Sequence, residues 1–156
     1  MTEIQRCTLP HALAGRDILG ASKTGSGKTL SYLIPVIENL YRNKWTELDG
    51  LGAIIICPTR ELALQVFEEA SKLFSEHQTS VALIIGGKSY NFEKDNIHRI
   101  NVIICTPGRL LQHMEESYGF NADNLQMLVL DEVDMLFELG FKETLNTILE
   151  ALPSEK

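Results

Sequence analysis

Short apolar runs are the feature of this sequence that most restricts its fold. Five of them recur along the chain, and they read "RDILGA", "AIIIC", "VALII", "NVIIC" and "MLVL". The runs are apolar on consecutive residues rather than on alternate ones, which is typical of parallel strands buried on both faces. They therefore predict a parallel sheet whose two faces are both covered.

Segments with helical spacing lie between these runs. Apolar residues recur every three or four positions between residues 62 and 74 and again between 141 and 152, before Pro153. This spacing places them on one side of a helix. The alternation of strand-like and helix-like segments predicts the α/β class, a parallel sheet with helices on both faces.

The length and composition of the chain predict one soluble domain spanning residues 1–156. The chain has 156 residues, of which 44% are hydrophobic, so it can bury a real core. No apolar run approaches the roughly 18 residues that a membrane span needs, and the N-terminus resembles no signal peptide. We expect an intracellular monomer with no membrane partner.

Charge, cysteine and histidine content exclude several kinds of site. The net charge of -7 argues against a generic basic nucleic-acid binder, so any such contact must be local. The three cysteines lack metal-ligand spacing, and Cys57 and Cys105 end apolar runs, where a free thiol packs as a small hydrophobe. The four histidines do not cluster, and we interpret them as surface or loop residues: His11, His77, His98 and His113.

The strongest local motif is the stretch "LGASKTGSGKTLSYLIP", which follows the short run "DIL" and leads into a helix from about Lys28. This context is typical of a phosphate-binding loop. Gly25 and Gly27 let backbone N–H groups face a phosphate, Lys28 reaches the terminal phosphates, and Thr29 can bind Mg²⁺. An accidental glycine-rich turn is the alternative, because Ser22 stands where the strict pattern has glycine. The predicted nucleotide-binding residues of this loop are Ser22, Lys23, Thr24, Gly25, Ser26, Gly27, Lys28 and Thr29.

A second motif, "LVLDEVDML", places acidic residues directly behind an apolar run. In a nucleotide fold with such a loop, Asp131 is suited to hold Mg²⁺, and Glu132 could position and deprotonate an attacking water. An acidic helix start, capped by Asp131 or Asp134, is one alternative. A protease recognition site at the tetrapeptide DEVD is another.

Two further loops, "CPTREL" and "CTPGRL", follow strand-like runs, and Gly86 and Gly87 follow a third. Ligands gather at the carboxyl ends of the strands in an open parallel sheet. Backbone N–H groups there, together with Arg60 and Arg109, would suit a phosphate-sugar backbone. Each loop taken alone is also a capped helix start with an exposed arginine, and the glycines are either a tight turn or a close backbone approach.

Taken together and in order, these motifs resemble those of the DEAD-box RNA helicases. The set is "TEIQ", "ASKTGSGKT", "PTREL", Gly86-Gly87, "TPGR" and "DEVD", and it covers essentially the whole chain. The resemblance implies the first of the family's two RecA-like P-loop domains, with ATP and Mg²⁺ as cofactors and Lys28, Asp131 and Glu132 as catalytic residues. It also implies that Gln5 reads the adenine edge. It assigns the RNA backbone to Pro58, Thr59, Arg60, Gly87, Thr106, Gly108 and Arg109.

The residues around the motifs resemble one subgroup of this family. "IIGGK", "LLQHM" and "NLQMLVLDE" are similar to the subgroup that acts in small-subunit ribosome assembly in the nucleolus. That likeness implies a role in rRNA processing, a nucleolar location and ribosome-assembly factors as partners. Trp45 is interpreted either as a packed surface aromatic or as a partner contact.

Two departures from the family pattern bear on catalysis. Val133 stands where the family has alanine, and its extra methyl groups could shift Asp131 by overpacking, at about 1–3 kcal/mol. The chain also ends at Lys156, before the second RecA-like domain that supplies arginine fingers. We therefore expect a domain fragment that binds nucleotide but hydrolyses it slowly, since a finger is worth on the order of a thousandfold in rate.

Two rival functions compete with an RNA helicase domain. The first is another class of P-loop enzyme, such as a small-molecule kinase or transporter ATPase, which the pair "PTREL" and "TPGR" disfavours. The second is a non-catalytic module that binds RNA or assembly factors after its nucleotide site has drifted. Ser22 and Val133 favour this module, and the retained Lys28 and Glu132 argue against it.

Overall fold

The chain forms two compact units in the computed structural model, which describes residues 1–154. The first unit spans residues 1–44, and the second begins at Trp45. Among the described residues, no helix is both long and apolar enough to cross a membrane.

The first unit consists of two helices that pack against each other, α1 (Glu3–Leu13) and α2 (Lys28–Arg42). A capping box formed by Thr2 and Gln5 begins α1, because it satisfies two backbone N–H groups that the helix itself leaves unpaired. The spacing of three and four residues on α2 buries Leu33, Val36 and Leu40. The predicted helix start at about Lys28 is therefore confirmed.

The run "RDILGA" is not a strand, and this prediction was wrong. Residues 16–23 have neither helical nor strand backbone, and Leu19 is 97% exposed. A strand is stabilised by hydrogen bonds to neighbouring strands, and every strand of the described chain lies in the second unit. The run has only two large apolar side chains, Ile18 and Leu19, too few to signal a buried strand.

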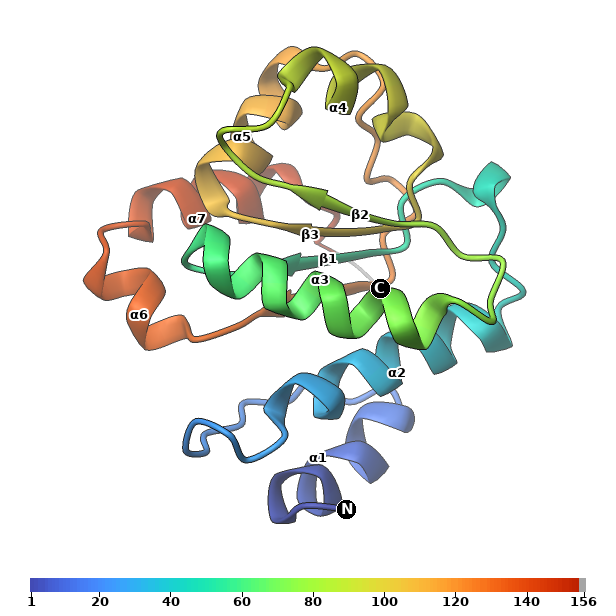
Figure 1. Ribbon diagram of the computed structural model, residues 1–156, viewed down its shortest axis with the longest axis vertical. Coiled ribbons are helices and arrows are strands. Elements are labelled where there is room, and N and C mark those ends of the chain that lie inside the picture. Colours follow the sequence, from blue (N-terminus) through green and yellow to red (C-terminus); the bar gives the residue numbers. More distant parts are fainter. Residues whose placement is uncertain (155–156) are drawn as a thin grey trace. The chain divides into compact units, whose positions relative to one another are not determined.

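The second unit is built on a four-stranded parallel sheet in the order β2-β3-β1-β4 (Figure 1). Its strands are β1 (Ala53–Ile56), β2 (Val81–Ile84), β3 (Val102–Cys105) and β4 (Met127–Leu130). In the strand register, Ile56 lies beside Cys105 and Leu130, so the strands end at one edge of the sheet. The predicted α/β class with a parallel sheet is confirmed.

Helices cover both faces of this sheet. Helix α3 (Arg60–Phe74) packs against β2 and β3 on one face, whereas α5 and α7 pack against each other over the opposite face (Figure 1). The remaining elements are α4 (Tyr90–Asn96), α5 (Pro107–Glu116), α6 (Val133–Glu138), α7 (Lys142–Ala151), and the short 3-10 helices Glu47–Asp49 and Ile97–Arg99.

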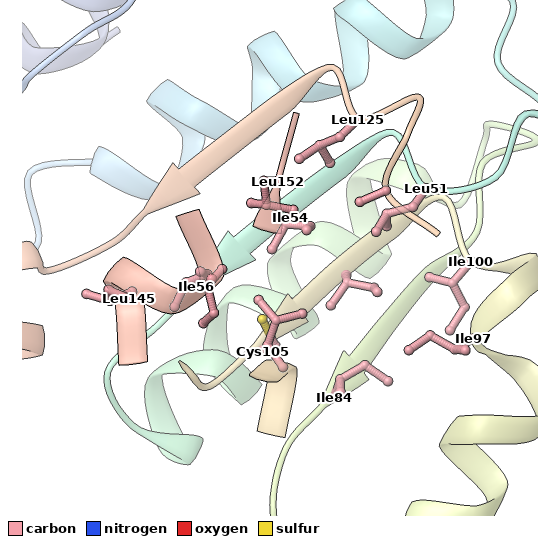
Figure 2. Close-up of a cluster of buried hydrophobic side chains, with 14 of the residues drawn as sticks. Leu51, Ile54, Ile56, Ile84, Ile97, Ile100, Cys105, Leu125, Leu145 and Leu152 are labelled. Carbon is pink, nitrogen blue, oxygen red and sulfur yellow. The ribbon is translucent and has the colours of Figure 1, made fainter. Parts of the chain in front are cut away.

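Alternate residues of the strands divide between the two faces. Figure 2 shows Ile54, Ile56 and Cys105 in one cluster with Leu145 of α7 and with Leu152. Their neighbours along the strands are also fully buried, because side chains alternate along a strand and both faces are covered. The continuous apolar runs of the sequence thus reflect burial on two sides.

The cysteines at the strand ends pack as apolar side chains, as predicted. Cys57 and Cys105 are buried, unoxidised thiols. Burial raises the pKa of the Cys57 thiol far above its ordinary value, and the nearby charge of Asp131 adds to the effect. Burial raises the pKa of the Cys105 thiol as well. Both thiols therefore stay protonated and unreactive at neutral pH.

Asn101 connects the segments that precede strands β1 and β2. Its side chain is fully buried, and Nδ2 donates to the carbonyl oxygens of Thr46 (2.9 Å) and Gly50 (2.8 Å). Its Oδ1 accepts from the backbone N–H of Ser80 at 3.1 Å. One amide thus joins the loop before β1 to the segment before β2, a connection that no local sequence pattern predicts.

Replacing Asn101 with alanine is expected to lower the free energy of unfolding by about 2–3 kcal/mol, because buried carbonyl and N–H groups lose their partners. Urea denaturation of both proteins measures this difference. Asn91→Ala, at an exposed position of α4, is the matched control and should change stability by less than about 0.5 kcal/mol. Equal stabilities of the two variants would contradict this role of Asn101.

Candidate functional site

The predicted phosphate loop lies in the first unit, directly before α2. Gly25 and Gly27 have φ angles of +77° and +87°, a left-handed conformation that favours glycine. The hydroxyl groups of Ser22 and Ser26 lie 2.6 Å apart across the loop. The loop then enters a helix of 15 residues at Lys28, whose N-terminal N–H groups and dipole favour an anion.

The side chain of Gln5 is hydrogen-bonded to this loop. Its side chain is buried, Oε1 accepts from the backbone N–H of Thr2 at 3.0 Å, and Nε2 donates to the carbonyl oxygen of Gly27 at 3.2 Å. A side-chain amide has two N–H donors and two acceptor lone pairs, so these bonds use half of its capacity. The structure therefore brings Gln5 and the phosphate loop together within the first unit.

Replacing Gly27 with alanine is expected to weaken nucleotide binding at least about tenfold. A Cβ atom at Gly27 would lie 2.6 Å from Gln5 Nε2, and the positive φ angle adds about 1–2 kcal/mol of strain. Calorimetric titration with Mg-ADP measures the effect. Gly15→Ala is the matched control, because Gly15 has a φ angle of +75° but no atom within 4 Å of the new Cβ. Equal affinities of the two variants would contradict the importance of the Gln5 contact.

The predicted catalytic acids, Asp131 and Glu132, lie in the second unit and directly follow β4. The backbone N–H of Asp131 donates to the carbonyl oxygen of Ile56 at 2.9 Å, and Asp131 Oδ1 accepts from the N–H of Glu132 at 3.0 Å. Glu132 has a φ angle of +48°, which is uncommon for a residue with a side chain and typical of functional sites. Glu132 itself occupies the N-cap position of α6, where the capping alternative had placed Asp131 or Asp134.

A groove of about 530 Å³ lies at the carboxyl ends of β1, β2 and β3. Six of the seven residues assigned to the RNA backbone line it, and the seventh, Gly87, lies against Arg60. The sequence assignment did not include Phe141 and Gln112, which also line the groove. The complete lining is Pro58, Thr59, Arg60, Glu61, Gly86, Thr106, Gly108, Arg109, Gln112 and Phe141.

Arg60 is the exposed cation of this groove. Its guanidinium lies against the loop after β2, where a Cβ atom at Gly86 would lie 2.9 Å from Nη2. Gly87 has a φ angle of +87°, so close approach and turn both require glycine at this loop. Thr59 also caps α3, because its hydroxyl accepts from the N–H of Leu62 at 3.2 Å. The capped-helix interpretation of this loop is therefore confirmed for Thr59.

The loop after β3 has the predicted helix start. Thr106 occupies the N-cap position of α5 and Pro107 the first helical position, although within the described residues the Thr106 hydroxyl makes no capping bond. Gly108 is exposed, and a Cβ atom there would meet nothing within 4 Å. This helix N-terminus therefore presents backbone to the groove.

Arg109 differs from Arg60, because its side chain is only 11% exposed. Its guanidinium forms an ion pair with Glu93 through Nε at 2.7 Å and lies over the ring of Tyr90, 4.9 Å from the centroid. Nη2 donates to the carbonyl oxygen of Lys88 at 2.8 Å, and Nη1 donates to Gln112 Oε1 at 3.1 Å. The charge of Arg109 is thus already paired within the protein.

The prediction that all four histidines lie at the surface or in loops was wrong for His113. This residue is fully buried in α5, with Nε2 at 2.8 Å from Glu93 Oε2 and Nδ1 at 2.8 Å from Ser117 Oγ. His113 follows Leu110 by three positions, so both fall on the buried side of the helix. That spacing was the available signal, and neither Glu93 nor Ser117 was predicted as its partner.

The described residues 1–154 contain no group of three or more histidine, cysteine and acidic side chains that could hold a metal ion. The oxygens of Thr29 and Asp131 are hard donors of the kind that Mg²⁺ accepts when nucleotide phosphates supply further ligands. These two residues belong to different units of the chain.

Comparisons with known proteins agree with the motif set. A family model described as DEAD/DEAH box helicase matches residues 2–156. The chain is 58% identical to "ATP-dependent RNA helicase DBP4" of Kluyveromyces lactis, over all of this chain and 20% of that protein. It is 56% identical to "Probable ATP-dependent RNA helicase ddx10" of Dictyostelium discoideum, over all of this chain and 18% of that protein. The chain therefore spans about a fifth of these curated relatives.

Solved structures share the fold. A DEAD box protein from the hyperthermophile Methanococcus jannaschii has a TM-score of 0.90 and 36% identity, covering 99% of this chain and 41% of that chain. A hypothetical ATP-dependent RNA helicase from Sulfolobus tokodaii has a TM-score of 0.84 and 31% identity, covering 96% and 42%. The RecA-like fold expected from the motifs is confirmed by these likenesses.

Proposed function

This chain belongs to the DEAD/DEAH box helicase family, and we propose that it is the part of an ATP-dependent RNA helicase that binds Mg-ATP and the RNA backbone. The observation that carries this proposal is the groove at the strand ends, which gathers the residues of three separate motifs. Unwinding and efficient hydrolysis would need the second RecA-like domain as a partner. The two relatives, each matched over about a fifth of its own length, carry the names "ATP-dependent RNA helicase DBP4" and "Probable ATP-dependent RNA helicase ddx10".

The phosphate loop is proposed to bind the nucleotide. Its two left-handed glycines and the start of α2 suit a phosphate cradle, because both direct backbone N–H groups toward an anion. Lys28 would contact the terminal phosphates as a cation, and Gln5 would hydrogen-bond the adenine edge with the donor and acceptor it has left. Thr29 and Asp131 would hold Mg²⁺, which neutralises charge that develops on the phosphates during transfer.

Glu132 is proposed as the residue that positions the attacking water and accepts its proton on the side-chain carboxylate. The left-handed backbone of Glu132 supports this role, since strain of this kind is retained where function requires it. An arginine from the second domain would stabilise the transferring phosphoryl group. Efficient turnover is therefore proposed to need that arginine in addition to the residues of this chain.

The groove is proposed to bind the sugar-phosphate backbone of RNA without reading its sequence, because phosphate contacts carry no base information. Arg60 would supply the positive charge. Backbone around Thr59, Gly87 and Gly108 would supply N–H donors. Such a local cation explains how a chain of net charge -7 could bind a polyanion.

Replacing Arg60 with alanine is expected to weaken single-stranded RNA binding about tenfold, since a hydrogen bond to a charged group is worth about 1.5–3 kcal/mol. The slope of log affinity against log salt should fall by about 0.7, the value for one phosphate contact on a single strand. Fluorescence anisotropy with a labelled oligonucleotide, repeated over a salt series, measures both quantities.

Lys72→Ala is the control for this experiment, because Lys72 is an exposed cation on the same helix α3 and lies outside the groove. Its loss should leave affinity nearly unchanged. If Arg60→Ala and Lys72→Ala weaken binding equally, RNA contacts the chain through diffuse charge and the groove has no special role.

A role in rRNA processing in the nucleolus is proposed, with ribosome-assembly factors as further partners. The proposal rests on the resemblance of the residues around the motifs to one subgroup of the family. The test is ultraviolet crosslinking of the full-length protein to RNA in cells, followed by sequencing. Enrichment of small-subunit precursor rRNA is the expected outcome. Enrichment of messenger RNA with no precursor rRNA would contradict the subgroup assignment.

A further inference from the structure

The groove contains two arginines whose surroundings differ sharply. Arg60 is exposed, whereas the Arg109 side chain is 11% exposed and its charge is paired with Glu93 at 2.7 Å. A phosphate that approached Arg109 would have to compete with a carboxylate already bound in a poorly solvated place. Arg109 is therefore poorly suited to act as a phosphate contact.

We propose that Arg109 is a positioning residue, anchored by Glu93 and His113, which fixes the loop after β2 relative to the start of α5. The inference rests on the proposed RNA function and changes the role that the family resemblance assigned to Arg109. RNA affinity would depend on Arg109 through the hydrogen bonds of its guanidinium and not through attraction between its charge and a phosphate.

The bonds of Arg109 join three elements of the second unit. Arg109 belongs to α5, Nη2 bonds the carbonyl oxygen of Lys88 in the loop after β2, and Nε bonds Glu93 in α4. Gly87 directly precedes Lys88, and Gly108 directly precedes Arg109. Any change in these bonds would therefore alter the spacing of two backbone segments that are proposed to contact the same RNA strand.

Glu93 is anchored in turn by two donors that share one of its oxygens. Its Oε2 accepts from Arg109 Nε and lies 2.8 Å from His113 Nε2. Its other oxygen, Oε1, is buried and has no hydrogen-bond partner among the described residues. Because an unsatisfied buried carboxylate oxygen is costly, this arrangement needs a compensating role. Holding the guanidinium of Arg109 in one orientation is such a role.

The side chain of His113 is also held in place by contacts with its neighbours. Its Nδ1 lies 2.8 Å from Ser117 Oγ, and its ring stacks on Tyr90 with centroids 4.6 Å apart. The hydroxyl of Tyr90 lies 3.1 Å from the same Ser117 Oγ. The Tyr90 ring thus contacts both His113 and the guanidinium of Arg109, which leaves the arginine little freedom to change rotamer.

Exchange of arginine for lysine distinguishes positioning from phosphate contact. Lysine keeps the charge but cannot reproduce the planar set of bonds to Glu93, Gln112 and Lys88. We expect Arg109→Lys to weaken single-stranded RNA binding as much as Arg109→Ala, on the order of tenfold, with the salt slope unchanged in both. Arg60→Lys should keep most of the affinity, and Arg60→Ala should lower the slope by about 0.7.

Amide hydrogen exchange tests the anchor without RNA. Glu93→Gln, His113→Gln and Arg109→Lys should each accelerate exchange in residues 86–89 and at the start of α5, while exchange in the strands stays as in the unchanged chain. Glu115→Gln is the matched control, because Glu115 is an exposed acid of α5 outside the network. Faster exchange confined to these two segments is the expected result.

The outcomes separate this inference from the proposed function. Wild-type affinity in Arg109→Lys, or a salt slope lowered by about 0.7 in Arg109→Ala, would make Arg109 a phosphate contact and overturn the inference while RNA binding stands. Absence of RNA binding by the unchanged chain would defeat the proposed function instead. In that case hydrogen exchange alone tests the positioning role of Arg109. If exchange in residues 86–89 and at the start of α5 is unaltered in Arg109→Lys and Glu93→Gln, the positioning role is overturned.

Discussion

Replacing Lys28 with alanine is expected to weaken Mg-ADP binding by about 100-fold. Lys28 begins α2 directly after the glycine turn, so its ammonium group can act together with the backbone N–H groups of the loop. A hydrogen bond to a charged group contributes about 1.5–3 kcal/mol, and about 2.7 kcal/mol corresponds to 100-fold. Isothermal titration calorimetry of both proteins measures the difference.

Lys72→Ala removes the same charge from an exposed position on α3 and serves as the control. It should bind Mg-ADP as tightly as the unchanged chain. Thermal melting without nucleotide should show that Lys28→Ala is folded. A loss smaller than about threefold in the folded variant would mean that the loop does not bind phosphate through Lys28.

Replacing Ile54 with alanine is expected to lower the free energy of unfolding of the second unit by about 3–5 kcal/mol. Ile54 is fully buried in β1, which lies between β3 and β4, and its side chain belongs to the main core cluster (Figure 2). Its removal leaves a cavity that rigid strands on both sides cannot close. Urea denaturation followed by circular dichroism measures the loss.

The variant Ile54→Val is the graded comparison, because it removes a single methylene group and should cost only about 0.5–1.5 kcal/mol. Nucleotide affinity of Ile54→Val should match that of the unchanged chain. If Ile54→Ala costs no more than Ile54→Val, the site collapses around the missing atoms and β1 is not a rigid centre of the core.

Four of the five strand-like runs were predicted correctly, and in the two central strands burial on both faces explains the continuous apolar signal. "AIIIC" and "NVIIC" form the adjacent strands β1 and β3, and nearly all their side chains are fully buried. "RDILGA" contains only two large apolar residues, and Leu19 is exposed to solvent. The residues of this run alone therefore do not indicate whether it pairs with another strand.

The candidate site was predictable where a motif has its own local chemistry. Thr59 and Thr106 at helix starts, and Gly87 at a left-handed position, follow from propensities of single residues. The contacts of Glu93 with Arg109 and His113 join residues 16 and 20 positions apart, so no periodic pattern reports them. The sequence likewise predicted Arg109 for its charge, whereas the fold determines that this charge is paired.

The effect of Val133 is still a prediction. The residue is the first of α6 and half-buried, directly after Glu132. Its extra methyl groups relative to alanine would act on the carboxylates through packing.

A competition titration of the unchanged chain tests the central claim most directly. The chain is titrated with Mg-ADP by calorimetry, and the titration is repeated in the presence of excess Mg-GDP. We expect saturable binding at one site that Mg-GDP does not suppress, because Gln5 beside the phosphate loop would read adenine. Absence of binding, or equal competition by Mg-GDP, would contradict an adenine-nucleotide site built on this loop.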